Sequence, residues 1–214
     1  MKITQEQRAW LYEQAFTIYP YGSIVYGTYQ EGISDTDFIV VVPPYLNHLD
    51  QQQWEYHNEQ YTLYSISTWR EKLNRHDIDA LECHFLPKNM VIKETIDFDF
   101  TLKTALLRQS ISSVASNSWV KCKKKLTVHE DFAPRVGKKS LWHALRILNF
   151  GIQLMTFKSI VDYGSMNELY DEIVNNPSDN WLFFKEKYQP IYNNSKSAFK
   201  LAHAANADTR EELL

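Results

Sequence analysis

The sequence YGSIVYGTYQEGISDTDFIVVV, residues 21–42, holds three of the chain's six glycines and two aspartates that stand two positions apart. It ends in an apolar, mostly β-branched run over 37–42 that predicts a buried strand, stopped by two prolines. Residues i and i+2 of a strand share a face, so Asp35 and Asp37 are expected to project together. The stretch therefore predicts a small-residue turn followed by a strand that begins with paired carboxylates.

This stretch also offers the surroundings that a nucleoside triphosphate needs. Two neighbouring carboxylates repel each other, whereas Mg²⁺ binds hard oxygen ligands and bridges them to phosphate oxygens. Gly22 lets the backbone approach a phosphate closely, and the N–H groups around Gly22 and Ser23, followed by a helical turn, can surround the anion. The Ser23 hydroxyl adds a donor. The alternative is structural: the glycines serve turns, and the Asp-Thr-Asp segment caps a loop.

The pattern of Gly22-Ser23, eleven residues and then Asp35-Thr36-Asp37 before an apolar strand resembles the signature of the DNA polymerase β-like nucleotidyltransferase superfamily. Further positions resemble its compact bacterial and phage members, which have a helical C-terminal half: Gly27, Thr28, Ser34 and the segment KKSLWHALRIL. The resemblance implies the α+β class. We therefore expect a small mixed β-sheet with flanking helices, like the palm of these enzymes, followed by an α-helical domain.

The resemblance implies that an acceptor hydroxyl attacks the α-phosphate of a nucleoside triphosphate and that pyrophosphate leaves. It implies two Mg²⁺ ions held by Asp35, Asp37 and a third carboxylate on a later strand, and the same three acids serve as catalytic residues. Glu82 in the segment ALECHFL fits the third place best, with Asp79 in reserve; the alternative for Glu82 is an exposed strand residue. The residues predicted to bind the nucleotide are Gly22, Ser23, Ser34, Lys139, His143 and Arg146.

The second half supplies cationic side chains. Lys139, His143 and Arg146 fall at i, i+4 and i+7 of a predicted helix, in a polar line beside a leucine stripe. They could face the triphosphate or the acceptor, or form an ordinary solvent-facing strip. Residues 121–139 hold seven Lys or Arg against two acidic residues, a net +5 that leaves −8 for the rest of the chain. This segment could bind a phosphate-rich partner or complement a helix dipole.

Periodicity and capping patterns predict the order of the elements. In the first half they predict a helix over 5–18, ended by Tyr19-Pro20, and a helix over 68–75, capped by Thr68 and Glu71. They also predict strands over 24–26, 37–42, 59–66 and 77–87. Helical periodicity follows from residue 101, with a later helix capped by Ser165 and Glu168 and a last helix interrupted or kinked at Pro190. A boundary near 95–101 is therefore predicted, with domains 1–98 and 99–214.

Composition limits the class of protein. With 214 residues, 44% hydrophobic and 14% aromatic, the chain can bury the core of one domain or of two small ones. A net charge of −3 provides no overall attraction to nucleic acid or anionic lipid. The two cysteines lack a metal-ligand spacing, and no stretch approaches ~18 apolar residues. We therefore expect a reduced, cytoplasmic protein without a zinc site or a membrane span.

The function predicted from the sequence is Mg²⁺-dependent transfer of a nucleoside monophosphate to a hydroxyl on an RNA end, a protein side chain or a small molecule. Two alternatives stay open: a catalytically silent nucleotide- or RNA-binding module, and a toxin–antitoxin or anti-defence partner that nucleotidylates a protein. The sequence does not choose the acceptor or the preferred base, because one catalytic scaffold can serve many substrates.

Overall fold

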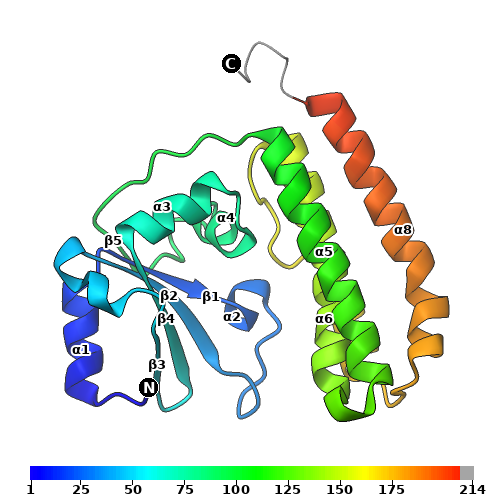
Figure 1. Ribbon diagram of the computed structural model, residues 1–214, viewed down its shortest axis with the longest axis horizontal. Coiled ribbons are helices and arrows are strands. Elements are labelled where there is room, and N and C mark those ends of the chain that lie inside the picture. The colour runs from blue at the N-terminus through cyan, green and yellow to red at the C-terminus, as the bar shows by residue number, and fades with distance from the viewer. Residues whose placement is uncertain (208–214) are drawn as a thin grey trace. The chain divides into compact units, whose positions relative to one another are not determined.

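The chain divides into two compact units in a computed structural model that describes residues 1–207 (Figure 1). The first unit, Met1–Thr101, contains a β-sheet and helices, and the described part of the second unit, which begins at Leu102, is helical. This arrangement confirms the predicted fold class, a mixed sheet with flanking helices followed by a helical half. That residues 1–98 and 99–214 are separate domains stays a prediction.

The first unit is built on a five-stranded sheet with the order β3-β4-β2-β1-β5. Its elements are α1 (Gln5–Gln14), β1 (Thr17–Tyr21), α2 (Ser23–Tyr26), β2 (Thr36–Val42), the 3-10 helix η1 (Pro44–Leu49), β3 (Gln53–Tyr56), β4 (Glu59–Ser65), α3 (Ile66–Asn74), α4 (Ile78–His84) and β5 (Lys93–Glu94). Strands β2 and β4 run parallel, and the other neighbouring pairs run antiparallel. The register sets Asp37 of β2 between Tyr21 of β1 and Gln60 of β4.

Helices cover both faces of this sheet (Figure 1). Helix α1 covers one face, in a core whose residues include Leu11, Ile18, Val40 and Leu63. Helices α3 and α4 lie on the other face, where Trp69 of α3 stacks on Tyr19 with ring centroids 5.7 Å apart. Tyr21 follows Tyr19 by two positions and lies opposite Asp37, so both share this second face. The sheet therefore carries Asp37 on the side of α3 and α4.

Strand β1 forms where the sequence analysis predicted the end of a helix, so that prediction is wrong. Helix α1 ends at Gln14, and the β-branched residues Thr17 and Ile18 take the extended backbone that they favour. Pro20 has no N–H to donate to a neighbouring strand. It fits in β1 because β5 pairs only with Thr17 and Ile18, so Pro20 lies beyond the end of that pairing.

Two of the strand predictions are also wrong. Residues 24–26 lie in α2, and the segment 77–87 contains α4. The buried residues of α4 include a set at helical spacing: Ile78, Leu81 and Glu82. Helix α3 begins earlier than predicted, because its N-cap is Ser65, whose hydroxyl accepts the N–H of Thr68 at 3.2 Å. The strands predicted over 37–42 and 59–66 are present as β2 and β4.

The described part of the second unit is a bundle of helices. Its elements are α5 (Thr104–Thr127), η2 (His129–Asp131), α6 (Pro134–Phe157), η3 (Asn167–Leu169), α7 (Tyr170–Val174) and α8 (Trp181–Asn206). Helix α6 is largely buried, including its predicted leucine stripe. A Cβ at Gly151 of α6 would lie 2.8 Å from both Ile111 of α5 and Phe199 of α8, so this glycine lets the two neighbouring helices pack closely.

Two details of the second half differ from the sequence analysis. The helix predicted to be capped by Ser165 begins at Tyr170, after the 3-10 turn η3, and the Ser165 hydroxyl accepts a hydrogen bond from Gln153 Nε2 at 3.3 Å. Pro190 lies inside α8, which continues through it, so of the two predicted effects an interruption is excluded and a kink stays a prediction. Tertiary packing of the helices commonly outweighs local signals such as a capping pattern or a proline.

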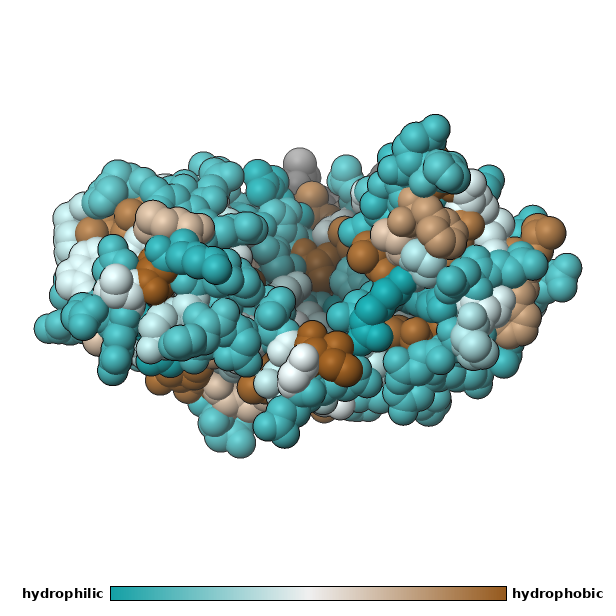
Figure 2. Space-filling view, turned by 90° about the horizontal axis from the view of Figure 1, so that it is seen from below, coloured by the Kyte–Doolittle hydropathy of each residue, from teal (hydrophilic) through white to brown (hydrophobic). Residues whose placement is uncertain are grey.

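Hydrophilic residues predominate on the face of the molecule drawn in Figure 2, and apolar side chains appear there in scattered groups. Exposed apolar residues such as Ile33, in the loop before β2, and Val136, in α6, are scattered along the chain, which is normal for a folded protein. Among residues 1–207, no helix is both long enough and apolar enough to cross a membrane.

Candidate active site

Gly22 and Asp37 meet at one end of the sheet. Tyr21 pairs with Asp37, and Gly22 follows with φ 71° and ψ −143°, a backbone conformation that suits glycine. A Cβ at Gly22 would lie 2.5 Å from Oδ2 of Asp37. The Asp37 carboxylate therefore rests directly against the backbone of the glycine turn, and a larger residue at position 22 would displace it.

The turn after Gly22 presents backbone N–H groups. The Gly22 carbonyl accepts from the N–H groups of Val25 at 3.0 Å and Tyr26 at 3.2 Å, which closes the first turn of α2. Within residues 1–207, the N–H groups of Ser23 and Ile24 donate to no backbone carbonyl, as is usual for the first residues of a helix. These groups are the donors that the sequence analysis predicted for an anion.

A cavity of about 230 Å³ lies beside Asp37 on the face of the sheet that carries α3 and α4. Its lining residues come from three strands and from α4: Tyr21, Asp37, Phe38, Ile39, Thr62, Tyr64 and Asp79. The cavity therefore contains two carboxylates. Asp79, the reserve candidate of the sequence analysis, is the acid that shares the cavity with Asp37, and it comes from a helix.

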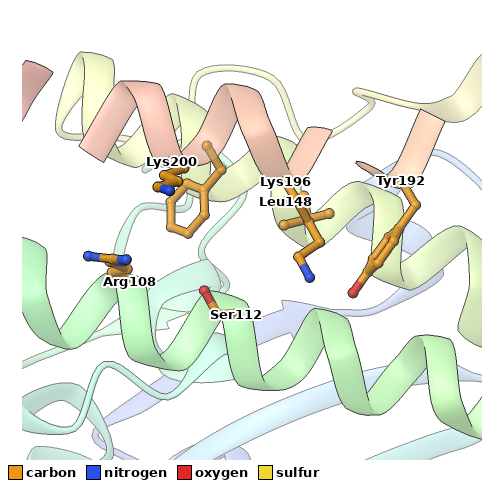
Figure 3. Close-up of a pocket in the computed structure, with 7 residues that line it drawn as sticks. Arg108, Ser112, Leu148, Tyr192, Lys196 and Lys200 are labelled. Carbon is orange, nitrogen blue, oxygen red and sulfur yellow. The ribbon is translucent and has the colours of Figure 1, made fainter. Parts of the chain in front are cut away.

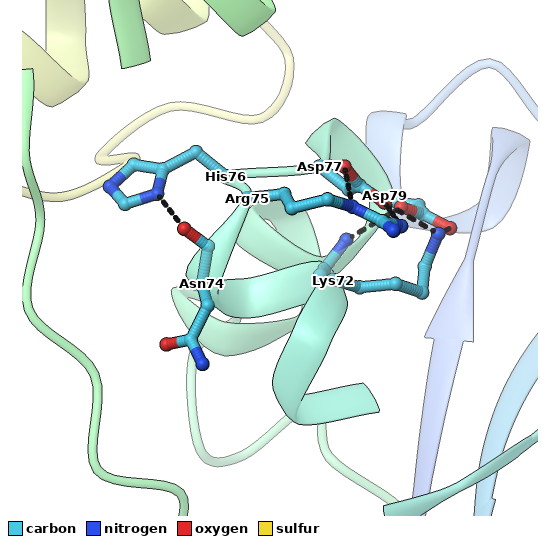
Figure 4. Close-up of polar contacts among 7 residues, drawn as sticks. Lys72, Asn74, Arg75, His76, Asp77 and Asp79 are labelled. Carbon is cyan, nitrogen blue, oxygen red and sulfur yellow. Dashed lines mark hydrogen bonds and ion pairs between the residues drawn. The ribbon is translucent and has the colours of Figure 1, made fainter. Parts of the chain in front are cut away.

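Lys72 of α3 holds Asp79 in place (Figure 4). Its Nζ lies 3.0 Å from Oδ2 of Asp79 and 3.3 Å from Oδ2 of Asp77, and Asp79 also accepts the N–H of Ala80 at 2.9 Å. Burial opposes the charge on Lys72, but Asp79, Tyr64 and Asp77 together outweigh burial and raise the pKa of Lys72. The ammonium group therefore stays charged and offsets part of the negative charge beside the cavity.

Sequence reasoning missed three polar side chains of this cavity: Tyr21, Thr62 and Tyr64. Thr62 and Tyr64 follow Gln60 at alternate positions of β4, and Gln60 pairs with Asp37, so all four side chains share one face. The alternation along β4 is visible in the sequence. The parallel register of β4 against β2 is not, because nothing local specifies which residue lies opposite Asp37.

Glu82 has surroundings that differ from the prediction. It lies in α4 instead of a strand, is 2% exposed, and accepts a hydrogen bond at Oε2 from the Tyr26 hydroxyl at 2.5 Å. Within residues 1–207, no group of three or more His, Cys, Asp or Glu side chains is arranged to hold a metal ion. That Asp35, Asp37 and Glu82 together hold a metal ion stays a prediction. In this structure Glu82 links α4 to the last residue of α2.

We expect Tyr26→Phe to destabilise the first unit by about 1–3 kcal/mol, because it removes a hydroxyl donor from a buried carboxylate. Glu82→Gln should cost less, because the amide retains an acceptor oxygen for Tyr26. Urea unfolding followed by tryptophan fluorescence measures both variants. A Glu82→Gln variant of unchanged stability that loses all transfer activity would contradict this assignment and favour the predicted role of Glu82 as a catalytic ligand.

Ser34 and Asp35 precede β2. The Ser34 hydroxyl accepts the N–H of Gln30 at 3.1 Å, and the Ser34 N–H donates to the Gln30 carbonyl at 2.8 Å, so Ser34 closes the loop that leads into the strand. Asp35 is exposed and stands immediately before the first strand residue. That Ser34 contacts the nucleotide, and that Asp35 and Asp37 act together, stay predictions.

The predicted polar line of Lys139, His143 and Arg146 does not form a solvent-facing strip. Lys139 is exposed, but Arg146 is 1% exposed, and its guanidinium carbon lies 5.2 Å and 4.9 Å from the ring centres of Trp142 and Phe150. Its Nη2 donates to Nδ1 of His143 at 2.9 Å. Two of the three side chains therefore take part in the packing of the second unit.

The stability of the second unit is expected to fall as the pH drops below about 6.5. Burial, and then the charge of Arg146, lower the pKa of His143 from 6.5 to about 3, which keeps its Nδ1 free to accept from Arg146. The unfolded chain binds a proton near pH 6.5 that the folded chain excludes down to about pH 3, so stability is lost as the pH falls through this window.

The matched variant is His143→Gln, which retains an acceptor and does not titrate. It should reduce the difference between urea midpoints measured at pH 7 and pH 5. The comparison with the unmodified chain is needed because burial also lowers the pKa of His84 in the first unit. Identical pH dependence in the two proteins would contradict the assignment to His143.

The basic run at the end of α5 is partly engaged in structural contacts. Lys124 and Lys125 form ion pairs with Asp131, just beyond the end of the helix. Lys138 is 6% exposed, and its Nζ lies 2.7 Å from a carboxylate oxygen of Asp179. For these three lysines the structure favours a local stabilising role over contact with a phosphate-rich partner.

Comparison with known proteins agrees with the geometry of the first unit. A family model described as a nucleotidyltransferase domain matches residues 3–99, a span that includes the sheet, the Gly22 turn and the cavity beside Asp37. No curated protein matches the chain. Residues 3–99 are therefore similar to a nucleotidyltransferase domain, and this match bears out the resemblance to the polymerase β-like superfamily.

Proposed function

We propose that the first unit transfers a nucleoside monophosphate from a nucleoside triphosphate to a hydroxyl acceptor and releases pyrophosphate. One observation carries the proposal: the Asp37 carboxylate rests against the Gly22 turn and lines a cavity that a second carboxylate also lines. The turn offers N–H donors to phosphate, and the carboxylates offer oxygen ligands to a cation. The family match supports nucleotidyl transfer in general, and the metal and the acceptor belong to this proposal.

Mg²⁺ is the cation that we propose for this site. Proteins commonly bind Mg²⁺ through one or two carboxylates, with water and substrate phosphates as the other ligands. Asp37 at the cavity, with exposed Asp35 two positions before it, fits this requirement for one ion. Mg²⁺, when bound, supplies positive charge that neutralises the triphosphate. Glu82 is already bonded to Tyr26, so we assign no second ion to it.

Asp79 is the residue that we propose to receive the acceptor's proton. As the hydroxyl oxygen bonds to the α-phosphorus, the bond to the β-phosphate oxygen breaks and the hydroxyl proton must move to a base within hydrogen-bond reach. Asp79 lines the same cavity as Asp37. Its contacts with Lys72 and the Ala80 N–H fix the carboxylate before substrate arrives, which lowers the entropic cost of positioning it.

The test is incubation of the full chain with each of the four α-³²P-labelled nucleoside triphosphates, Mg²⁺ and a cell extract. Release of pyrophosphate together with transfer of label supports the proposal. Nuclease-sensitive label identifies an RNA acceptor, protease-sensitive label identifies a protein, and label that resists both treatments identifies a small molecule. This assay therefore measures the activity and the acceptor class together.

The alternative functions predict other outcomes in this assay. A catalytically silent module binds labelled nucleotide or RNA but releases no pyrophosphate with any extract, and that result would overturn the proposal. A partner in a toxin–antitoxin or anti-defence system transfers label to a discrete protein band, which retains the proposed chemistry and specifies the acceptor.

A further inference from the structure

The second unit contains a cavity that the proposed function does not use (Figure 3). Its volume is about 170 Å³, and its walls come from α5, α6 and α8. The residues that line it are Arg108, Ser112, Leu148, Tyr192, Lys196, Phe199 and Lys200. An apolar floor combined with a cationic rim sets this cavity apart from the one beside Asp37.

The floor of this cavity is apolar and partly aromatic. Leu148, Tyr192 and Phe199 are 1%, 6% and 3% exposed, so packing fixes their positions. Phe199 lies against Gly151, where any side chain would collide with its ring. An apolar cavity of about 150 Å³ accommodates benzene, so this one has room for a planar ring. Sites for whole small molecules exceed about 300 Å³, so the rest of the ligand must lie outside.

The rim of this cavity is positively charged. Arg108 comes from α5, Lys196 and Lys200 come from α8, and all three side chains are exposed. Among residues 1–207, no carboxylate forms an ion pair with any of them, whereas Lys125 and Lys138 of the same unit each pair with an aspartate. An anion at the mouth of the cavity would therefore meet three positive charges that no described acidic group offsets.

Figure 3 shows that the polar groups converge on the space between α5 and α8. Lys196 and Tyr192 extend from α8 toward α5, and Ser112 of α5 points its hydroxyl into the same space. The Lys196 Nζ lies 5.4 Å from the centre of the Tyr192 ring, and the Tyr192 hydroxyl donates to Oγ of Ser116 at 3.5 Å. A cation beside a fixed aromatic ring is suited to a ligand that combines a planar group with negative charge.

We propose that this cavity binds one nucleotide unit, with the base on the apolar floor and the phosphate at the cationic rim. Stacking on aromatic side chains and attraction of phosphate to cations are the two contributions that hold single-stranded nucleic acid without sequence preference. A fatty acid does not fit this cavity, because its chain would require an apolar channel longer than the space for one ring. The nucleotide is either free or part of an RNA strand. This site needs no transfer activity from the first unit.

The test measures binding of the full chain, carrying Asp37→Asn, to a short fluorescein-labelled oligouridine by fluorescence anisotropy in EDTA. These conditions exclude metal-dependent binding at the first unit. Adding Arg108→Ala and Lys200→Ala should raise Kd about tenfold. It should also make the slope of log Kd against log salt shallower by about 1.4, because two phosphate contacts are lost from a single strand. Both side chains are exposed, so circular dichroism should show an unchanged fold.

The matched control replaces Lys123 and Lys185, exposed residues of the same two helices that do not line the cavity, and should leave Kd within twofold. Displacement by millimolar AMP identifies a free nucleotide as sufficient, and binding that AMP does not displace identifies the strand. Any of three results would overturn the proposal. Both double variants weaken binding equally, neither probe binds, or the chain binds an acidic peptide in preference to RNA. A chain that transfers nucleotides yet fails here overturns this site alone.

Discussion

Replacing Asp37 with asparagine should reduce nucleotidyl transfer by about 10³-fold while leaving the fold intact. The substitution keeps the shape of a side chain that rests against Gly22, so packing around the turn is preserved. It removes the negative charge that the proposed cation requires at the cavity. Removal of one preorganised electrostatic group from an active site commonly costs 10²- to 10³-fold, and a metal ligand belongs at the upper end of that range.

The measurement is the rate of pyrophosphate release at saturating Mg²⁺ and nucleoside triphosphate, with the acceptor identified by the extract assay. Asp99→Asn is the control, because Asp99 is an exposed acid of the same unit that does not line the cavity, and the change in net charge is the same. We expect the control to retain activity. An Asp37→Asn variant within tenfold of the unmodified rate would place the reactive centre elsewhere in the chain.

Gly22→Ala should destabilise the first unit by about 3 kcal/mol or more and abolish nucleotide binding. The φ of 71° strains any L side chain, at a cost of about 1–3 kcal/mol. The new methyl group would also lie 2.5 Å from the Asp37 carboxylate, so either the turn or the acid must move. Both displacements separate the N–H donors of the turn from the carboxylate, and the proposed nucleotide site depends on their proximity.

Gly32→Ala is the matched control for this experiment. Gly32 has φ 73°, but no atom lies within 4 Å of a Cβ placed there, so the backbone strain is present without the collision. We expect a cost of about 1 kcal/mol and normal nucleotide binding. Urea unfolding and calorimetric titration with a non-hydrolysable nucleoside triphosphate measure the two effects. Equal losses in both variants would show that the contact with Asp37 contributes nothing.

The strand that carries Asp37 could be predicted because its signal is local. A continuous β-branched run specifies β2, and alternation specifies β4, whatever the rest of the chain does. The position of Asp37 at the start of β2 could therefore also be predicted from the sequence. Its neighbours Tyr21 and Gln60 did not, because pairing register depends on residues distant in the sequence.

The third carboxylate shows where local patterns fail. The segment 77–87 is short, and its apolar residues fit an imperfect alternation as well as a helical spacing. Packing against the sheet selects the helix, which brings Asp79 to the cavity and directs Glu82 to Tyr26. Predicting a strand where a helix forms therefore led the sequence analysis to prefer Glu82 over Asp79, although Asp79 is the acid that lines the cavity.

The helical unit shows a second limit of sequence reasoning. The helix over α6 was correctly predicted, but the same spacing placed Arg146 on a polar face. Helix α6 packs against α5, α7 and α8, so little of its circumference faces solvent. How many helices pack around a given helix depends on the whole bundle, so hydrophobic periodicity along one segment cannot predict it.

Strand β1 meets β5 at Thr17 and Ile18, and Pro20 follows on the same strand before the glycine turn. A bare strand edge is a template on which another polypeptide can add by main-chain hydrogen bonding, and proline has no N–H to offer such an intruder. Pro20 therefore leaves this part of the β1 edge without one of the N–H donors that an added strand would need, on the strand that leads into the Gly22 turn.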